Sequence, residues 1–425
     1  MRIRVVGVNH KTAPLPVRER LAFDEPRTAA ALAELKQLYP HGQFVLLSTC
    51  NRTELYSAAP PDADAHPVEL GAWLSRFCRF DPHGLTPYLY DYQDQAAVRH
   101  LLAVACSLDS MIVGEVQIPA QVRESYRRAC AAAAAGKIIH RLFHCAFATS
   151  KEVYAATSIA QRRLSIAAVA VELARRAFAP LASARVLVLG AGEMGELLIR
   201  HLLDVGCRPD HVTVAARTGR RTAELATRYG VNVAIEPTPA ARLDPADIVI
   251  GAAAADGFLY DKTSLHAALP GRRRKPLLLI DLAVPRNFDP ALAELDDVFL
   301  YCLDDLAAVA HEQLGPHADD LAAAEQIIAD NVESFLHWFG VRDVGPLVGQ
   351  LRRRFHDISR AELDKFFRTE RHLTPLARRQ LETLVNRTVN KLLHGVIQSL
   401  HRVARERGSA EAARFVESVL QEQPR

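Results

Sequence analysis

Hydrophobic residues follow two kinds of spacing in the first 160 residues. Strand-like runs occur at four places: Ile3–Val8, Phe44–Ser48, Glu54–Ser57 and Tyr88–Tyr90. Helical spacing is predicted over 68–78, 93–108 and 117–157, and in a segment that Asp24 caps, with Pro26 in its first turn and its end before Pro40. This mixture predicts an α+β domain over residues 1–160.

A different pattern begins near residue 165. Strands are predicted at 185–189, 212–215, 232–235, 248–251 and 277–281, and helices at 165–178, 196–203 and 221–229. Strands that alternate with helices are typical of a parallel sheet covered by helices on both faces. We therefore predict a Rossmann-like α/β domain over residues 161–302.

The remaining residues, 303–425, are predicted to be entirely helical. An apolar stripe at intervals of three and four is formed by Leu321, Ala324, Ile328, Val332 and Phe335. Gly315-Pro316 interrupts this stretch, and a proline inside a helix removes a hydrogen bond and bends it. A stripe on a helix too long to be covered by its own domain predicts a homodimer formed by these helices.

Composition narrows the class of protein. The 425 residues are 49% hydrophobic and 24% charged, as in an average soluble globular protein. We find no apolar run of about 18 residues and no signal peptide at the N-terminus. The seven cysteines are scattered, without a pair at metal-ligand spacing, so we expect no metal site and a reducing, cytoplasmic location.

The net charge of +3 hides an uneven distribution of charge along the chain. Residues 289–341 contain 12 acidic residues and no Lys or Arg, whereas residues 341–425 contain 17 Lys and Arg against 10 Asp and Glu. These segments are either solvated faces of helices or, for the basic one, a surface that meets an anionic partner.

A glycine-rich turn follows the predicted strand at 185–189. Its sequence, Gly190-Ala191-Gly192-Glu193-Met194-Gly195, opens a helix, which is the context required of a dinucleotide-binding motif. In such a motif the glycines permit a tight turn, close approach of the pyrophosphate and close packing of helix on strand. We predict that these six residues bind a cofactor; the alternative is a turn without a ligand.

The residues at the end of the next predicted strand indicate which dinucleotide binds. It ends in Arg217 and Thr218, with Arg220 and Arg221 close behind, where an NAD enzyme usually carries Asp or Glu. Because a guanidinium suits a 2′-phosphate, we predict NADPH, bound by Arg217 and Thr218. The alternative is that these arginines only begin a solvated helix.

Cys50 directly follows a predicted strand and is flanked by Thr49, Asn51 and Arg52. Polar, partly electropositive surroundings favour the thiolate, so Cys50 is a candidate nucleophile. The alternative is a buried structural cysteine. By residue pattern alone, His100 is more typical of a surface or satisfied core histidine, and the polar residues between 108 and 117 are more typical of helix caps.

Together these segments resemble one family, glutamyl-tRNA reductase, in order along nearly the whole chain. The matching strings are Gly7–Pro14, Ser48–Glu54, Leu108–Ser110, Gly114–Ile118, Gly190–Gly195 and Asp281–Arg286. The Asn-His-Lys-Thr-Ala-Pro and Ser-Thr-Cys-Asn-Arg sequences are highly specific. Two segments depart from the family by being poor in Ser and Thr, 166–168 and 251–255, and Gly315-Pro316 falls where the family has an unbroken helix.

The resemblance implies NADPH-dependent reduction of glutamyl-tRNA to glutamate-1-semialdehyde, the first step of tetrapyrrole synthesis. It implies a catalytic domain, a nucleotide-binding domain, and a dimerisation domain joined by a long spinal helix. It places Cys50 as the residue that forms a thioester, His100 near the reacting centre, and Arg52 on the substrate carboxylate. The other implied substrate contacts are Thr49, Asn51, Ser110, Glu115, Val116, Gln117 and Gln121. The partners implied are glutamyl-tRNA and glutamate-1-semialdehyde aminomutase.

Two other functions remain open on the sequence. A shikimate-dehydrogenase-like NADP oxidoreductase would use the same nucleotide domain but would leave the residues around Cys50 and the helical tail without a role. A non-catalytic tRNA-binding protein would use the basic tail and would tolerate loss of Cys50.

Overall fold

The computed structural model forms two compact units, Met1–Ala329 and Asp330–Arg425. The residues it describes are 1–60, 67–115, 117–159, 165–178, 180–217, 219–235, 246–255, 257–268, 275–306, 318–341, 344–370, 372–407 and 409–421. The predicted interruption at Gly315-Pro316 lies outside the described residues. The first unit contains two separate sheets, one on each side of the predicted boundary near residue 160.

The first sheet is antiparallel, with strand order β2-β3-β1-β4. Its strands are β1 (Arg2–Asn9), β2 (Gln43–Ser48), β3 (Arg52–Ala59) and β4 (Tyr90–Gln93). The first three strands are confirmed, but the fourth begins at the end of the segment predicted for it, because Thr86–Tyr88 forms a 3₁₀ turn instead. The order is that of a ferredoxin-like sheet.

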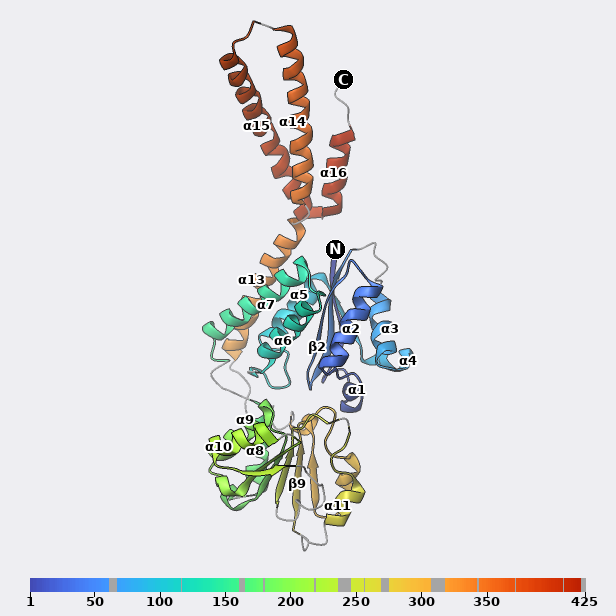
Figure 1. Cartoon of the computed structure of the whole chain (residues 1–425), viewed down its shortest axis with the longest axis vertical. Coiled ribbons are helices and arrows are strands. Elements are labelled where there is room, and N and C mark those ends of the chain that lie inside the picture. Colours follow the sequence, from blue (N-terminus) through green and yellow to red (C-terminus); the bar gives the residue numbers. More distant parts are fainter. Residues whose placement is uncertain are drawn as a thin grey trace. The chain divides into compact units, whose positions relative to one another are not determined.

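Helices cover both faces of this sheet (Figure 1). On one face lie α2 (Glu25–Leu38) and α3 (Pro67–Phe77), and on the other lie α5 (Asp94–Ala105), α6 (Ile118–Ala131) and α7 (Lys137–Ala156). Two short helices, α1 (Leu15–Arg20) and α4 (Pro82–Leu85), complete this part. As predicted, the Asp24 side chain caps α2 by accepting from the Arg27 amide at 2.8 Å.

The helical segment predicted over 117–157 is confirmed as two helices, because the chain breaks between α6 and α7. Ala133 has a left-handed φ of 50°. The Gln43 side chain on β2 then accepts from the backbone amides of Ile138 and Ile139 at 3.0 and 3.1 Å. A long-range polar contact thus satisfies the first turn of α7, and local helical spacing does not reveal such a contact.

The second sheet is parallel, with strand order β10-β9-β8-β5-β6-β7. The bounds are β5 (Val186–Leu189), β6 (Val212–Ala216), β7 (Asn232–Ile235), β8 (Ile248–Gly251), β9 (Leu277–Asp281) and β10 (Val298–Tyr301). The helices are α8 (Ile166–Ala177), α9 (Glu193–Asp204), α10 (Gly219–Tyr229) and α11 (Lys262–Ala268). The five predicted strands are confirmed; β10 was missed, and α9 begins three residues earlier than predicted.

Alternate residues of the parallel strands belong to two apolar cores. Val186 and Val188 pack with α8 and α9, whereas Leu187 and Leu189 pack with Tyr260 and the segment around α11. Helices therefore cover both faces of the sheet (Figure 1). The strand order reverses between β5 and β8, which is where doubly wound sheets bind ligands.

The long helix α13 (Ala318–Val341) carries the predicted apolar stripe. Ala324, Ile328, Val332 and Phe335 are each at most 4% exposed in the single chain. The stripe is therefore already covered, and the argument that drew a dimer from its exposure is wrong. None of the helices formed by the described residues is long and apolar enough to cross a membrane.

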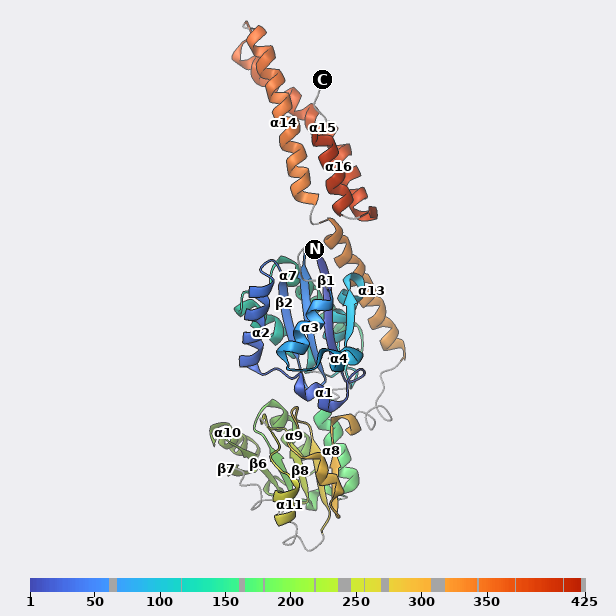
Figure 2. The ribbon, with the colours of Figure 1, turned by 90° about the vertical axis from the view of Figure 1, so that its right-hand side faces the viewer.

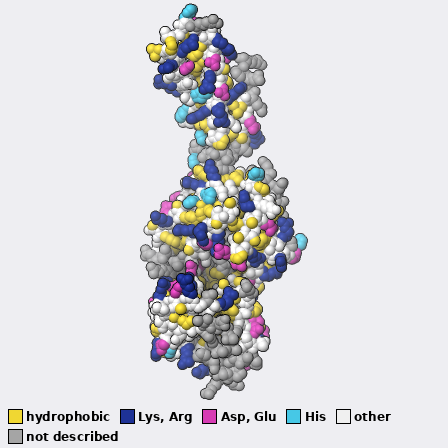
Figure 3. Space-filling view, viewed as in Figure 1, with side chains coloured by type: hydrophobic (Ala, Val, Ile, Leu, Met, Phe, Trp, Pro, Cys, Tyr) yellow, Lys and Arg dark blue, Asp and Glu magenta, His cyan; other side chains and the backbone are white. Residues whose placement is uncertain are grey.

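The C-terminal unit consists mainly of three helices packed side by side (Figure 2). They are α14 (Val344–Thr369), α15 (Pro375–Arg407) and α16 (Ser409–Gln421), and their small core includes Leu351, Leu400 and Val416. On α15, Leu376, Leu384 and Leu392 are between 60% and 68% exposed. Figure 3 shows that Lys and Arg outnumber Asp and Glu on the visible face of these helices.

Candidate active site

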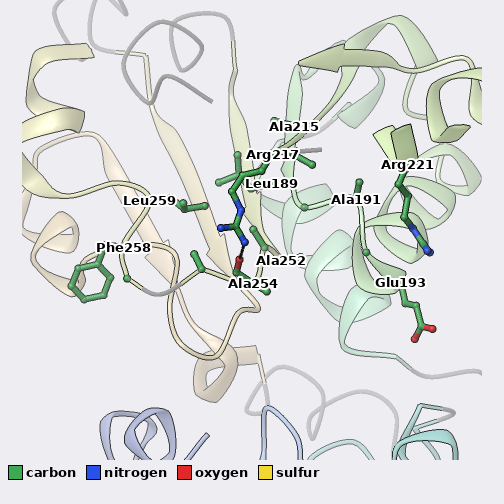
Figure 4. A pocket seen from close by; sticks show the side chains of 16 residues that line it. Leu189, Ala191, Glu193, Ala215, Arg217, Arg221, Ala252, Ala254, Phe258 and Leu259 are labelled. Atoms are coloured by element: carbon green, nitrogen blue, oxygen red, sulfur yellow. Dashed lines mark hydrogen bonds between the residues drawn. The ribbon is translucent and has the colours of Figure 1, made fainter. Parts of the chain in front are cut away.

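A pocket of about 720 Å³ lies at the carboxyl ends of β5, β6 and β8 (Figure 4). Gly190 begins it with a left-handed φ of 108°, and a Cβ there would lie 2.6 Å from the Ala252 carbonyl oxygen. A Cβ on Gly195 would lie 1.9 Å from the Gly190 oxygen, whereas one on Gly192 would meet nothing within 4 Å. The first and third glycines are thus required by packing, and the second leaves open space for a ligand.

Some of the predicted cofactor residues line the pocket, and others pack behind it. Gly190, Ala191, Gly192 and Glu193 line the pocket, while Met194 packs against the apolar core behind it. Helix α9 begins at Glu193, so its free amides open toward this space.

Two arginines reach this pocket. Arg217 donates to the Ala254 carbonyl at 2.9 Å, and Arg221 enters from α10 on the other side of Ala191 (Figure 4). Arg220 is not part of the lining; it is exposed and paired with Glu224. Thr218 lies outside the described residues.

A second cluster, on the antiparallel sheet, is built around Glu54. This fully buried carboxylate accepts from His100 Nε2 at 2.8 Å, from Arg52 Nη1 at 2.5 Å, and from the hydroxyls of Tyr56 and Tyr90 at 2.5 Å. We call these five residues the Glu54 cluster. Because Nε2 of His100 donates to Glu54, Nδ1 is left as the ring atom that can exchange a proton.

Strand register assembles the Glu54 cluster. Gly7 on β1 is paired with Glu54 on β3 and with Tyr90 on β4. A Cβ on Gly7 would lie 2.9 Å from the Glu54 Cα and 3.0 Å from its Cγ. The missing side chain at Gly7 therefore lets the carboxylate lie across β1 and reach Tyr90. Neither Tyr56 nor Tyr90 was predicted, and the strand pairing that brings them together is not local in sequence.

Interactions within the Glu54 cluster keep Glu54 and Arg52 charged. Burial alone would raise the pKa of Glu54, but Arg52 and His100 hold it well below its usual range. Burial would lower the pKa of Arg52, and Glu54 raises it instead. Burial raises the pKa of Tyr56 and of Tyr90, and the Glu54 charge adds to both shifts, so both phenols stay protonated donors.

Arg52 has more internal partners than a free substrate-binding side chain would have. Besides Glu54, it contacts the backbone oxygen and the carboxylate of Asp109. Its Nε is buried without a partner. The role predicted for Arg52 on the substrate carboxylate stays a prediction, and Nε is the atom left for it.

Cys50 lies in the tight turn between β2 and β3. Thr49 Oγ1 accepts from the amides of Asn51 and Arg52 at 3.2 Å, and Arg18 donates to the Cys50 carbonyl and to the Asn51 side chain. Thr49 and Asn51 therefore shape this turn. The Cys50 side chain packs against the apolar core that also contains β5 and α9.

The sequence predicts that the surroundings of Cys50 favour its thiolate, but in the structure they favour the protonated thiol. Burial, and after it the charge of Glu115, raises the pKa of Cys50 to about 12, and Arg18 and Arg52 offset only part of this rise. Burial likewise raises the pKa of Glu115 to about 7. Cys50 is therefore a protonated thiol near neutral pH.

The segment between α5 and α6 supplies further predicted residues. The Ser107 hydroxyl donates to the Glu115 carbonyl at 2.7 Å and bonds with the Tyr154 hydroxyl, which fixes the loop that carries Ser110 and Glu115. Gln117 and Gln121 begin α6, and the Gln121 amide donates to the Gln117 carbonyl. Val116 lies outside the described residues.

Several buried polar atoms around this loop lack a partner within the described part of the chain. They are Ser110 Oγ, Gln121 Oε1, Arg52 Nε and His10 Nδ1. Buried polar atoms are normally bonded, so a group of orphans indicates a place for a polar ligand. His10 was not predicted as a site residue, although it lies in the Gly7–Pro14 string; burial lowers its pKa to about 4, so it is neutral.

Ion pairs join the two sheet-containing parts of the first unit near Cys50. Glu19 on α1 makes a bidentate pair with Arg286 at 2.7 and 2.8 Å, and Arg18 pairs with Asp304. Asp281 folds the segment after β9 by accepting from the amides of Asn287 and Phe288 at 2.9 Å. The Asp281–Arg286 string therefore shapes this contact.

Comparisons with known proteins match both sheet-containing parts and the C-terminal helices. Family models described as the N-terminal domain of glutamyl-tRNA reductase, shikimate/quinate 5-dehydrogenase, and the glutamyl-tRNA reductase dimerisation domain match residues 6–157, 172–309 and 323–422. Glutamyl-tRNA reductase of Magnetococcus marinus is 37% identical over 96% of both chains, and that of Aromatoleum aromaticum is 36% identical over 99% of this chain and 98% of its own. A solved structure, glutamyl-tRNA reductase from Methanopyrus kandleri, is 29% identical, covers 98% of both chains and gives a TM-score of 0.51.

A parallel sheet with a dinucleotide-type pocket at the carboxyl ends of its strands defines an oxidoreductase with a nicotinamide cofactor. Within that class, the chain belongs to the glutamyl-tRNA reductase family.

Proposed function

We propose that this protein reduces the glutamyl ester of tRNA to glutamate-1-semialdehyde with NADPH, through a thioester on Cys50. The supporting observation is the place of Cys50 between the two sheets: it lies in the turn between β2 and β3, and its side chain packs on the core that contains β5 and α9. That core also contains Ala191, which lines the nucleotide pocket, so Cys50 and the pocket share one core. The shikimate-dehydrogenase-like alternative leaves the Glu54 cluster unused.

The residues divide the acyl-transfer step between them. The Cys50 sulfur attacks the ester carbonyl while its proton passes to Glu115, whose pKa of about 7 suits proton transfer near neutral pH. His100, whose Nε2 is held by Glu54, must carry a proton on Nδ1 as well. It gives this Nδ1 proton to the departing 3′-oxygen of the tRNA while Glu115 keeps the proton from Cys50. Ser110 Oγ and Arg52 Nε donate to the carboxylate of the glutamyl group, and Gln121 Oε1 accepts from its ammonium group.

The nucleotide pocket fits NADPH by its shape and its charge. The open side of Gly192 and the amides at the start of α9 would hold the pyrophosphate, and Arg217 and Arg221 would meet the 2′-phosphate. When bound, this cofactor supplies the hydride that reduces the thioester.

The test separates acyl transfer from reduction. Glutamyl-tRNA carrying labelled glutamate, mixed with enzyme without cofactor, should leave label on the protein that survives acid and is discharged by hydroxylamine. Addition of NADPH should convert it to aldehyde, and free glutamate should not react. Cys50→Ser should lose labelling and aldehyde formation together. Substantial activity in Cys50→Ser would disprove the covalent step, and wild-type enzyme inactive on glutamyl-tRNA would disprove the function.

We also propose that the chain forms a homodimer through its C-terminal unit, and that glutamate-1-semialdehyde aminomutase takes up the aldehyde. Support for the dimer comes from the matched dimerisation model and from the exposed leucines of α15. Light scattering should give about twice the chain mass of 46.9 kDa. Leu384→Glu should produce monomers, whereas Leu38→Glu, on the exposed face of α2, should not; a wild-type monomer at micromolar concentration would contradict the dimer.

A further inference from the structure

A second cavity, of about 440 Å³, has the catalytic candidate His100 in its wall. Its lining also includes Lys11, Tyr92, Arg99 and Asp109, together with Glu325 at the start of α13. None of the residues that line the nucleotide pocket takes part in it. Its volume is within the range of pockets that hold small ligands.

Tyr92 presents an aromatic face to this cavity. Its ring stacks on that of Tyr90, with centroids 5.2 Å apart, and lies 5.1 Å from the His100 ring. The Tyr90 hydroxyl is anchored on Glu54, so the ring beneath Tyr92 is fixed. Tyr92 is nevertheless 39% exposed. A held aromatic ring with an open face is the feature that stacks a nucleic-acid base.

Two cations stand beside this ring. Lys11 pairs with Asp109, and Arg99 pairs with Glu325, and both cationic side chains are more than half exposed. The Arg99–Glu325 pair is exposed on both sides and therefore weak, so a phosphate could replace the Glu325 carboxylate at little cost. The Asp109 side chain, by contrast, is 20% exposed and also pairs with Arg52. The cavity therefore offers a stacking surface, two cations and a catalytic imidazole in one place.

We infer that this cavity binds the 3′-terminal adenosine of the tRNA. The inference rests on the proposed function, because His100 can protonate the departing 3′-oxygen only if the terminal ribose lies beside it. Of the substrate, only its nucleotides carry a ring for Tyr92 and phosphates for Lys11 and Arg99; the glutamyl group has neither. Tyr92 stacks the base, and Arg99 meets the adjoining phosphate.

The test measures binding of uncharged tRNA, which requires no reduction. Wild-type protein should bind tRNA ending in CCA about 5- to 150-fold more tightly than the same tRNA ending in CC, as expected for one stacked base. Tyr92→Leu should abolish this preference without changing affinity for the CC form, and Tyr92→Phe should keep it. NADPH binding by each variant checks that the protein is folded.

A salt titration tests the phosphate contact separately. Arg99→Gln should reduce the slope of log affinity against log salt by about 0.7, the value for one single-strand phosphate. Arg127→Gln, an exposed arginine paired with Glu124 on α6, should leave the slope unchanged.

Three results would overturn the assignment: equal wild-type affinity for both tRNAs, a CCA preference that survives Tyr92→Leu, or an equal loss of both affinities in that variant. An enzyme that reduces glutamyl-tRNA but shows one of these results keeps its function and loses this site. A Tyr92-dependent preference in a protein that never reduces glutamyl-tRNA would keep the site and reject the function.

Discussion

The nucleotide pocket and the Glu54 cluster are built in opposite ways. The pocket is made largely of backbone and small side chains, with glycines placed where a Cβ would collide or would fill the cavity. The Glu54 cluster is made of buried side chains that hold one another in charged states. The first provides space for a ligand, whereas the second fixes the positions of a few reactive atoms.

The difference predicts how each region responds to mutation. A substitution in the pocket can remove ligand binding while the fold remains, because the ligand's space is empty of protein atoms. A substitution in the Glu54 cluster leaves a buried charge without its partner, so stability and chemistry should change together. Four variants test this contrast, from the largest expected effect to the smallest.

Gly192→Asp should abolish reduction and leave the fold intact. A Cβ at this position meets nothing within 4 Å, so the new carboxylate enters open space and repels the pyrophosphate. The variant should still form the Cys50 thioester, seen as label retained in the presence of NADPH. Gly195→Ala is the contrasting case, because its Cβ would collide with the Gly190 oxygen; it should lower the melting temperature. If Gly192→Asp no longer unfolded cooperatively on heating, the contrast between the nucleotide pocket and the Glu54 cluster would be wrong.

These two regions were not equally predictable from sequence. The glycine motif and the strands beside it are contiguous, so local pattern identified the pocket and placed Arg217 at it. The Glu54 cluster combines β3, β4 and α5, and its geometry depends on the pairing of Gly7 with Glu54 and Tyr90. For this reason, residue pattern alone favoured a surface or core role for His100 over a catalytic one.

Burial explains the remaining error at the site. From sequence, the polar neighbours of Cys50 favoured a thiolate. In the structure, desolvation and Glu115 outweigh Arg18 and Arg52, and the pKa of the thiol rises. Neither the packing of Cys50 on a distant core nor the position of Glu115 is visible in the local sequence.

Glu54→Gln should destabilise the first unit by about 3–5 kcal/mol at pH 7, the usual cost of breaking a buried ion pair. The melting temperature should fall on the order of 10 °C. Because the folded-state pKa of Glu54 is depressed, its contribution is present above its ordinary pKa of 4.5 and is lost as pH falls below it. The stabilities of the wild type and Glu54→Gln should therefore become more similar as the pH falls below 4.5.

Two controls define this effect. Tyr56→Phe removes one donor but no charge, so it should cost about 1.5–3 kcal/mol. Glu325→Gln breaks an exposed pair and should cost at most about 1 kcal/mol. Equal stability of Glu54→Gln and Glu325→Gln would show that the cluster is not a buried charge network.

Glu115→Gln should stabilise the protein, but only at high pH. The folded-state pKa of Glu115 is raised from 4.5 to about 7, so the wild type loses stability as pH rises through this interval. The variant should gain up to about 3 kcal/mol over wild type above pH 7, and the difference should disappear below pH 4.5. Calorimetry from pH 4 to 9 measures it. Cys50 should also be alkylated faster at pH 8 in this variant than in the wild type. A difference in stability that does not depend on pH would contradict the raised pKa of Glu115.

Arg217→Ala should reduce the preference for NADPH over NADH by roughly 10- to 150-fold, the equivalent of about 1.5–3 kcal/mol for one charge-assisted contact. The Arg217 guanidinium lies in the pocket lining and donates to the Ala254 carbonyl at 2.9 Å, so it is held where a 2′-phosphate would bind. Values of kcat/KM should fall for NADPH and stay constant for NADH. Arg220→Ala, which removes an arginine that does not line the pocket, is the matched control and should change neither value. If Arg217→Ala leaves discrimination intact while Arg221→Ala removes it, phosphate recognition belongs to α10 rather than to the end of β6.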